Sequence, residues 1–168
     1  MSGVAPEFSR PVPLTRLGAR PLRQTIAAGE TERAALARRF ALLSLDRLEA
    51  VVELARESGG TILLTAEFSA DFAQECVVTL DPVPGSIEAC FTLRYGPPDA
   101  EPESEADDDP AFEPLTGDAI DIGEAVAQEF SLSLPPFPRA PDAVVEEAPP
   151  EPAGISPFAV LGRNDRDD

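Results

Sequence analysis

The chain has 168 residues, enough for one modest hydrophobic core, and its 31 acidic and 13 basic residues give a formal charge of −18. It has no histidine and two cysteines, so it lacks the usual proton shuttle at neutral pH and cannot complete a four-ligand structural zinc site from Cys and His alone. No stretch approaches the roughly 20 apolar residues of a membrane-spanning helix, and no signal peptide is recognisable, so we expect a cytoplasmic protein.

The charge is unevenly distributed along the chain. Residues 1–60 contain nine Arg and seven acidic residues, whereas residues 61–168 contain four Arg and twenty-four acidic residues. The sequence therefore predicts a mildly basic N-terminal part and a strongly acidic remainder.

The first predicted elements are an edge strand and a helix. Residues 8–29, FSRPVPLTRLGARPLRQTIAAG, combine prolines with alternating apolar residues, which is typical of an edge strand followed by a loop. Residues 29–42, GETERAALARRFAL, are rich in helix formers, with Thr31 as the expected N-cap and Glu32 in the first turn. Arg33, Arg38 and Arg39 are expected to point largely outward from this helix.

Residues 47–60, RLEAVVELARESGG, fit two structures. Leu48, Val51, Val52 and Ala55 have helical spacing, whereas Leu48, Ala50, Val52 and Leu54 alternate as in a strand. Helix propensity alone favours a helix, and the two glycines that follow indicate a turn.

The next segment predicts an antiparallel meander. Apolar residues alternate from Ile62 to Phe68 and again from Ile87 to Leu93. Between them, DPVPG at residues 81–85 supplies turn chemistry, with Gly85 free to adopt a positive φ.

Two acidic, proline-rich runs flank a second predicted helix. This helix begins after Asp121 as its N-cap, has Ile122, Val126 and Phe130 along one stripe, and ends before Pro135 and Pro136. Residues 96–113 are expected to be a disordered acidic insertion. Residues 141–168 are expected to be a disordered Pro- and Glu-rich tail, with a short apolar motif at residues 155–161 that packs on its own domain or on a partner.

Together these elements predict a single α+β domain over residues 1–140. The expected architecture is an antiparallel meander or small barrel-like sheet with two packed helices.

The sequence contains few signals of catalysis or of ligand binding. Cys76 and Cys90 could form a metal site or a disulfide or supply a nucleophile, but small apolar filler is the favoured role for both. There is no phosphate-binding glycine loop, and acidic pairs are frequent only in the runs expected to be disordered. We therefore expect no enzyme activity, no cofactor and no small-molecule substrate.

Several segments, in this order, resemble the YceD family of bacterial and plastid proteins. These are ERAALARRFAL, QECVVTLDPV, DIGEAVAQEFSLSLPPFPR and the terminal SPFAVL, and the likeness extends over about Arg10 to Arg139 plus the tail. The resemblance favours a strand over residues 47–56, and it implies a non-catalytic role in accumulation of the large-subunit ribosomal RNA. The family-motif positions are Cys76, Thr79, Asp121, Glu124, Gln128, Pro135, Pro136, Phe158 and Leu161.

The same resemblance bears on the cysteines. Many members of the family carry a C-x-x-C pair where this chain has Cys76 and Thr79, and some have further cysteines after the final helix, where this chain has none. If those cysteines bind a metal in relatives, this chain has lost that ability.

Two modes of partner binding follow from the charge pattern. In one, the acidic segments and the sheet bind a basic ribosomal protein. In the other, exposed arginines contact 23S ribosomal RNA. The alternatives are an acidic protein–protein adaptor unrelated to the ribosome and a structural domain that serves lipid or envelope metabolism. The arginines expected to contact RNA or a partner are Arg10, Arg16, Arg20, Arg23, Arg33, Arg38, Arg39 and Arg139.

Overall fold

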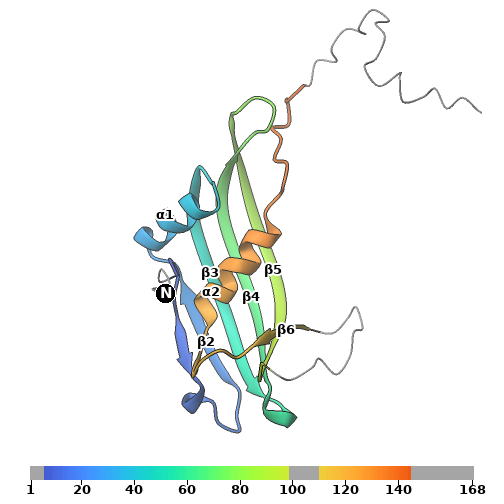
Figure 1. Ribbon diagram of the computed structural model, residues 1–168. Coiled ribbons are helices and arrows are strands. Elements are labelled where there is room, and N and C mark those ends of the chain that lie inside the picture. The colour runs from blue at the N-terminus through green and yellow to red at the C-terminus, as the bar shows by residue number, and fades with distance from the viewer. Residues whose placement is uncertain (1–5, 99–109, 145–168) are drawn as a thin grey trace, which may run out of the picture.

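The computed structural model describes residues 6–98 and 110–144, which form strands, two α-helices and two 3-10 turns (Figure 1). The strands are β1 (Pro11–Pro13), β2 (Leu22–Ala27), β3 (Ser44–Arg56), β4 (Ile62–Glu75), β5 (Pro82–Gly96), β6 (Ala111–Pro114) and β7 (Ala119–Asp121). The helices are α1 (Glu30–Arg39) and α2 (Ile122–Ser133), and the 3-10 turns are η1 (Leu14–Arg16) and η2 (Ser58–Gly60).

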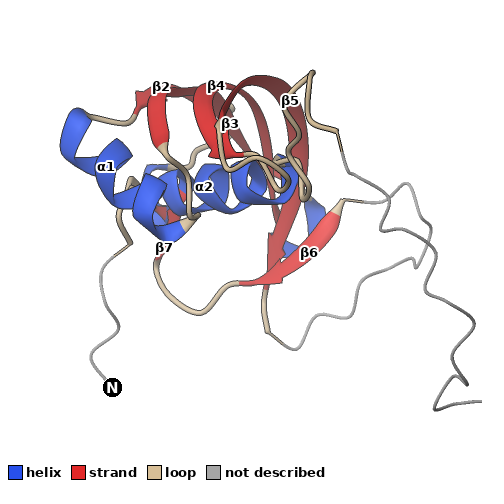
Figure 2. Cartoon of the chain, turned by 90° about the horizontal axis from the view of Figure 1, so that it is seen from above, coloured by secondary structure: helices blue, strands red, loops and turns tan. Residues whose placement is uncertain are grey.

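The main sheet has the strand order β2-β3-β4-β5-β6. Strands β2 to β5 pair antiparallel with their sequence neighbours, as expected for a meander, whereas β6 pairs parallel with β5. Strands β1 and β7 form a separate antiparallel pair. Helix α2 lies on the concave side of the arched sheet, and α1 packs beside it (Figure 2).

The α+β class is confirmed, but the barrel-like alternative is wrong. Among the described strands, β2 and β6 are the two edges of the sheet, and they do not pair with each other. The edges stay apart because α2 and its apolar side chains fill the space that a closed barrel would need.

Residues 44–56 form a continuous strand, as the family resemblance favoured and helix propensity did not. Leu48, Ala50, Val52 and Leu54 are all at most 3% exposed, because both β2 and β4 pair with β3 and one face is covered by the helices. The expected turn at the end of this segment is also present, with Gly59 and Gly60 at φ 79° and 83°.

The turn between β4 and β5 lies earlier than DPVPG. The two strands pair from Ile62 opposite Tyr95 to Glu75 opposite Pro82, so residues 76–81 make the turn and Leu80 takes the positive φ of 65°. Pro82 and Pro84 belong to β5 and are tolerated because this part of β5 has no strand on its other side among the described residues.

Gly85 is needed for packing and not for a turn. It lies opposite Phe72 in the ladder, and a Cβ atom at position 85 would be 2.7 Å from the Phe72 ring. The glycine therefore makes room for an aromatic side chain that belongs to the core.

Helix α1 begins at Glu30, two residues earlier than a Thr31 cap would require. Gly29 is the N-cap, and its backbone N–H donates to Oε2 of Glu32 at 2.8 Å. Glu32 lies in the first turn, as expected. Thr31 as N-cap was wrong because Glu32 reaches back to Gly29 and satisfies the donor that starts the helix.

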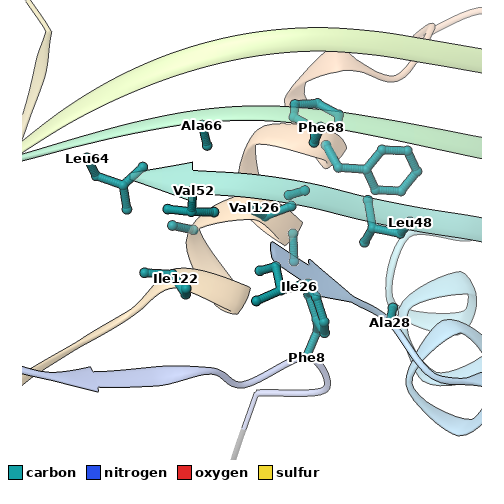
Figure 3. Packing of buried hydrophobic residues seen from close by; sticks show 14 of the residues in the cluster. Phe8, Ile26, Ala28, Leu48, Val52, Leu64, Ala66, Phe68, Ile122 and Val126 are labelled. Carbon is teal, nitrogen blue, oxygen red and sulfur yellow. The ribbon is translucent and has the colours of Figure 1, made fainter. Parts of the chain in front are cut away.

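Helix α2 matches its sequence pattern and completes the core. Ile122, Val126 and Phe130 are at most 1% exposed, and Figure 3 shows Ile122 and Val126 facing the sheet. The helix ends before Pro135 and Pro136, as expected. The Phe130 ring makes edge-to-face contacts with Phe40 of the segment after α1 and with the two β4 phenylalanines, Phe68 and Phe72. The core therefore joins α1, α2 and the sheet.

The prediction of a disordered acidic insertion at residues 96–113 is wrong for the residues at both ends of that range. Gly96 closes β5, and Ala111–Pro114 form β6 against Leu93–Gly96. Residues 99–109 lie outside the described part, as do 145–168 with the apolar motif at residues 155–161.

Candidate interaction surfaces

Asp121, one of the expected family-motif positions, is the centre of a hydrogen-bond cluster. Its Oδ1 accepts from the backbone N–H groups of Gly123 and Glu124, both at 3.1 Å, which caps α2 as the sequence predicted. The same carboxylate accepts from the Arg10 backbone N–H at 2.7 Å and from the Ser9 hydroxyl. Asp121 thus ties the N-terminal segment to the start of α2.

Glu124 and Gln128 extend this cluster to α1. The Arg39 guanidinium donates to both carboxylate oxygens of Glu124 at 2.7 and 2.9 Å, and also to Glu7 at 2.9 Å. Gln128 donates to Glu124 at 3.1 Å. The Arg39 hydrogen bond holds the pKa of Glu124 below its ordinary value, and Glu124 in turn raises the pKa of Arg39. These family-motif residues therefore stabilise the packing of two helices.

Arg10 is likewise held in an ion pair. It donates to the two oxygens of Glu32 at 2.7 and 2.8 Å, and its guanidinium lies 4.7 Å from the centre of the Phe8 ring. This hydrogen bond lowers the pKa of Glu32. Arg10 and Arg39 were both expected to contact a partner, but their guanidinium groups form ion pairs within the fold.

The other predicted arginines are exposed or half-exposed, and they are divided between the two ends of the sheet and β2. Arg33 donates to the Ala28 carbonyl at 2.8 Å. Arg38 is the penultimate residue of α1, which begins near one end of β3, where the Ala28 N–H donates to the Leu48 carbonyl. Arg16 is the last residue of η1, which lies at the other end of β3, where Arg56 donates to the Leu14 carbonyl. These ends are about 25 Å apart at 3.3 Å per strand residue. Within the described ranges, the predicted contact arginines without an ion pair are Arg16, Arg20, Arg23, Arg33, Arg38 and Arg139, and Arg56 also has none.

Cys76 occupies a turn that is bound to the segment after α2. Its side chain is fully buried, and its Sγ accepts from the backbone N–H groups of Val78, Thr79 and Ala140 at 3.3 to 3.4 Å. The Thr79 hydroxyl and these amides lower the pKa of the thiol to about 7. The cysteine is therefore more than apolar filler, because it links the β4–β5 turn to residues 138–140.

Cys90 is remote from Cys76. Cys90 is exposed on β5, opposite Glu67. It lies eight residues along β5 from Pro82, the first residue after the turn that contains Cys76. Eight strand residues correspond to about 26 Å, far beyond the reach of a disulfide.

Apolar side chains are exposed around the Cys76 turn. Val77 is 49% and Leu80 is 66% exposed, and Phe137 beside them is 75% exposed. Val77 donates its backbone N–H to the Pro138 carbonyl, and Gln74 donates to the Pro135 carbonyl, so the family-motif prolines follow this end of the sheet (Figure 1).

The face of the sheet opposite the helices carries a group of carboxylates that our sequence analysis did not single out. Glu49 and Glu53 of β3, Glu67 of β4 and Glu88 of β5 are all exposed on this face. The signal was present in the sequence, because these acids occupy the polar positions of strands whose alternate residues are buried.

This face is also hollowed. A depression of about 530 Å³ is lined by Glu49, Glu67 and Glu88, together with Thr25, Val51, Ser69 and Cys90. It thus combines carboxylates with a floor of small and apolar side chains.

The described residues contain neither a metal cluster nor a membrane-spanning helix. Among them, no three His, Cys, Asp or Glu side chains gather closely enough to hold a metal ion. Of the two helices described, neither is long and apolar enough to cross a membrane.

The fold and these surfaces define a class of protein: an α+β fold with an acidic open sheet face and a hydrogen-bond network around Asp121 and Glu124 at the start of α2. The chain belongs to the YceD family, described as the large ribosomal RNA subunit accumulation protein YceD, whose model matches residues 64–158, more than half of the chain. No match was found among curated proteins or among solved structures.

The matched range includes some of the expected positions and leaves out others. It begins in β4 and covers Cys76, Asp121 and Phe158, but it ends before Leu161. It leaves out residues 10–63, which the resemblance was expected to include and which carry most of the predicted contact arginines.

Proposed function

We propose that this chain is a non-catalytic factor in biogenesis of the large ribosomal subunit that works in the cytoplasm. The observation that carries the proposal is the family match, since the family is described by accumulation of the large-subunit ribosomal RNA. The role is to hold another macromolecule during assembly, with no bond made or broken.

The direct partner in this proposal is a basic ribosomal protein. Support comes from the twenty-four acidic residues after residue 60 and from the exposed carboxylates on the open sheet face. Such a surface attracts cationic proteins and repels RNA at long range. Contact with pre-ribosomal RNA through Arg16, Arg20 and Arg38 is a secondary element of the proposal.

Depletion of the protein in its own host tests the cellular role. The expected result is a loss of mature 50S particles and a lower ratio of 23S to 16S RNA in sucrose-gradient profiles. A normal complement of 50S particles would leave the unrelated acidic adaptor as the better reading of the chain.

Direct binding separates the two kinds of partner. Labelled 23S fragments and purified basic large-subunit proteins are titrated against the chain at low and at physiological salt. If only RNA binds, and the double variant Arg16→Ala, Arg20→Ala weakens it, the protein-partner proposal is wrong. These two arginines make no ion pair in the described structure, so their removal leaves the helix network intact.

A further inference from the structure

The open face of the main sheet lacks a covering element in the described part of the chain. Helices α1 and α2 pack on the other face, and none of the described segments lies over this one (Figure 2). Its side chains come from the alternate residues of β2 to β5, centred on the row Thr25, Val51, Glu67 and Cys90, which the strand register places side by side.

Glu67 lies at the centre of a group of carboxylates. Val51 is its direct partner on β3, so Glu49 and Glu53 are its diagonal neighbours, and Glu88 is diagonal to it on β5. Diagonal neighbours on a sheet are about 7–8 Å apart, which is within Coulomb range. Four like charges thus repel one another on one small surface.

The cations on this face compensate only part of this repulsion, and Arg23 of β2, directly opposite Glu53 in the strand register, is the one beside the margin of the group. Arg47 pairs with Asp71 at 2.7 Å and lies 4.0 Å from Glu49, and Arg94 pairs with Glu57 at 3.0 Å. Within the described ranges, Glu53, Glu67 and Glu88 have no ion pair. On the helix side, by contrast, Glu7, Glu32 and Glu124 are each paired with an arginine.

The geometry fits a chain of cations better than a single ion. One metal ion needs its oxygen ligands within about 2.6 Å of itself, which carboxylates on diagonal strand positions do not provide. An extended peptide can instead place successive cationic side chains on successive carboxylates. The floor of Thr25, Val51 and Cys90 suits the aliphatic stems of Arg and Lys.

We propose that this face binds an extended Arg- or Lys-rich segment of a partner protein through Glu49, Glu67 and Glu88, with Glu53 at its margin. The proposal rests on the proposed function, because it assigns the surface that receives the basic ribosomal protein. The single occupant is a cationic polypeptide, and RNA is disfavoured because four exposed carboxylates repel phosphate.

The central experiment compares two variants with the same loss of charge. The face variant is Glu49→Gln, Glu67→Gln, Glu88→Gln, and the control is Glu30→Gln, Asp118→Asn, Asp142→Asn, which changes three exposed acids away from this face. The probe is a fluorescein-labelled peptide of alternating Arg and Ser, followed by anisotropy at 0.15 M salt. The full chain is used throughout.

The face variant is expected to bind the peptide about tenfold more weakly, because local ion pairs are lost. The control is expected to change by about twofold or less, because charges beyond the Debye length of about 8 Å are screened. Equal weakening in both variants would mean that peptide binding depends only on the net charge of the protein. No weakening in either variant would mean that the peptide does not bind to this face. Both results overturn the proposal. Circular dichroism of the face variant checks that it remains folded.

Cys90 gives a second measurement that needs no charge variant. It is exposed in the depression, while Cys76 is fully buried. Bound peptide is expected to slow alkylation of Cys90 by a maleimide at least about threefold, the occlusion expected of a covered thiol. An unchanged rate at saturating peptide would place the peptide elsewhere.

The two proposals can fail separately. If depletion lowers 50S particles but the face and control variants bind alike, the cellular role stands and this face is excluded. If the face variant alone loses the peptide but depletion leaves 50S particles normal, the face binds a basic partner outside the ribosome. If a labelled 23S fragment protects Cys90 and the peptide does not, the face is an RNA surface and the proposal is wrong.

Discussion

Asp121 connects three parts of the chain through one carboxylate, so its loss should be costly. Asp121→Ala removes the N-cap of α2 and the acceptor for Ser9 and the Arg10 backbone N–H. We expect a fall of about 2–3 kcal/mol in the free energy of unfolding, since a cap contributes up to about 2 kcal/mol and a further amide loses its partner. Urea denaturation followed by circular dichroism measures it.

A nearby aspartate provides the control for this change. Asp118→Ala alters an exposed side chain three residues earlier and should change stability by about 0.5 kcal/mol or less. Equal losses in the two variants would mean that the Asp121 cluster adds nothing beyond a general effect of acidity.

Cys76 predicts a pH dependence that can be measured directly. Hydrogen bonds from the Thr79 hydroxyl and from backbone amides lower the pKa of the folded thiol from its ordinary 9.0 to about 7. Because the folded state releases this proton more readily than the unfolded state, the contribution to stability is present above pH 9 and is lost as pH falls through 7. In a Cys90→Ser background, thiolate absorbance near 240 nm should therefore rise with a midpoint near pH 7.

Thr79→Ala in the same background separates the hydroxyl from the amides. The midpoint should move towards 9, because the largest of the lowering interactions is removed. A midpoint above about 8.5 in the parent variant, close to an ordinary thiol, would contradict the hydrogen-bonded geometry of this turn.

At the scale of elements, the β4–β5 pair depends on one glycine. Gly85→Ala would bring a Cβ to 2.7 Å from the Phe72 ring, so we expect a loss of about 1–3 kcal/mol from overpacking. Most of that loss should disappear in a Phe72→Leu background, where the ring is absent. Gly18→Ala is the matched control, because a Cβ at that position meets nothing within 4 Å.

Chemical denaturation of the four combinations gives the coupling energy between positions 72 and 85. Additive losses would mean that Gly85 is required for backbone freedom and not for the aromatic ring.

The elements differ in how far their own sequence determines them. Ile122, Val126 and Phe130 repeat at helical spacing after a capping aspartate, so α2 could be predicted in type and in both ends. Residues 47–56 could not be assigned by periodicity, because Leu48 and Val52 fit both periods. They form a strand because β2 and β4 supply its hydrogen bonds.

The misplaced turn and cap have a common cause. Residues 81–85 have turn composition, but Gly85 lies in β5 because it must leave room for the ring of Phe72, thirteen residues earlier. Thr31 is not the N-cap of α1, because the Glu32 side chain binds the backbone N–H of Gly29. In both cases a contact with another residue overrides the local sequence preference. The open acidic face was missed for the same reason: Glu49, Glu67 and Glu88 come from three strands, and only the register brings them together.

At the scale of the whole molecule, the charges have two different roles. On the helix side, Arg10 and Arg39 are held in ion pairs and Arg33 donates to a carbonyl. In the proposed function, the acids of the open face and of residues 99–109 act on a partner instead. Long-range steering depends on total charge and changes the association rate, whereas local contacts change mainly the dissociation rate.

This distinction gives the last prediction. Residues 99–109 contain seven acids, and replacing them all by Asn or Gln reduces the net charge from −18 to −11 without shortening the connection between the parallel strands β5 and β6. Shortening it would be uninformative, because parallel neighbours need a long connection. For a basic large-subunit ribosomal protein measured by stopped flow, the association rate should fall about three- to tenfold at 0.05 M salt and by less than about twofold at 0.5 M. The dissociation rate of this variant should barely change. In the Glu49→Gln, Glu67→Gln, Glu88→Gln variant, by contrast, dissociation should accelerate at both salt concentrations. If both variants altered the same rate constant by the same factor, steering and docking would not be separate properties of this molecule.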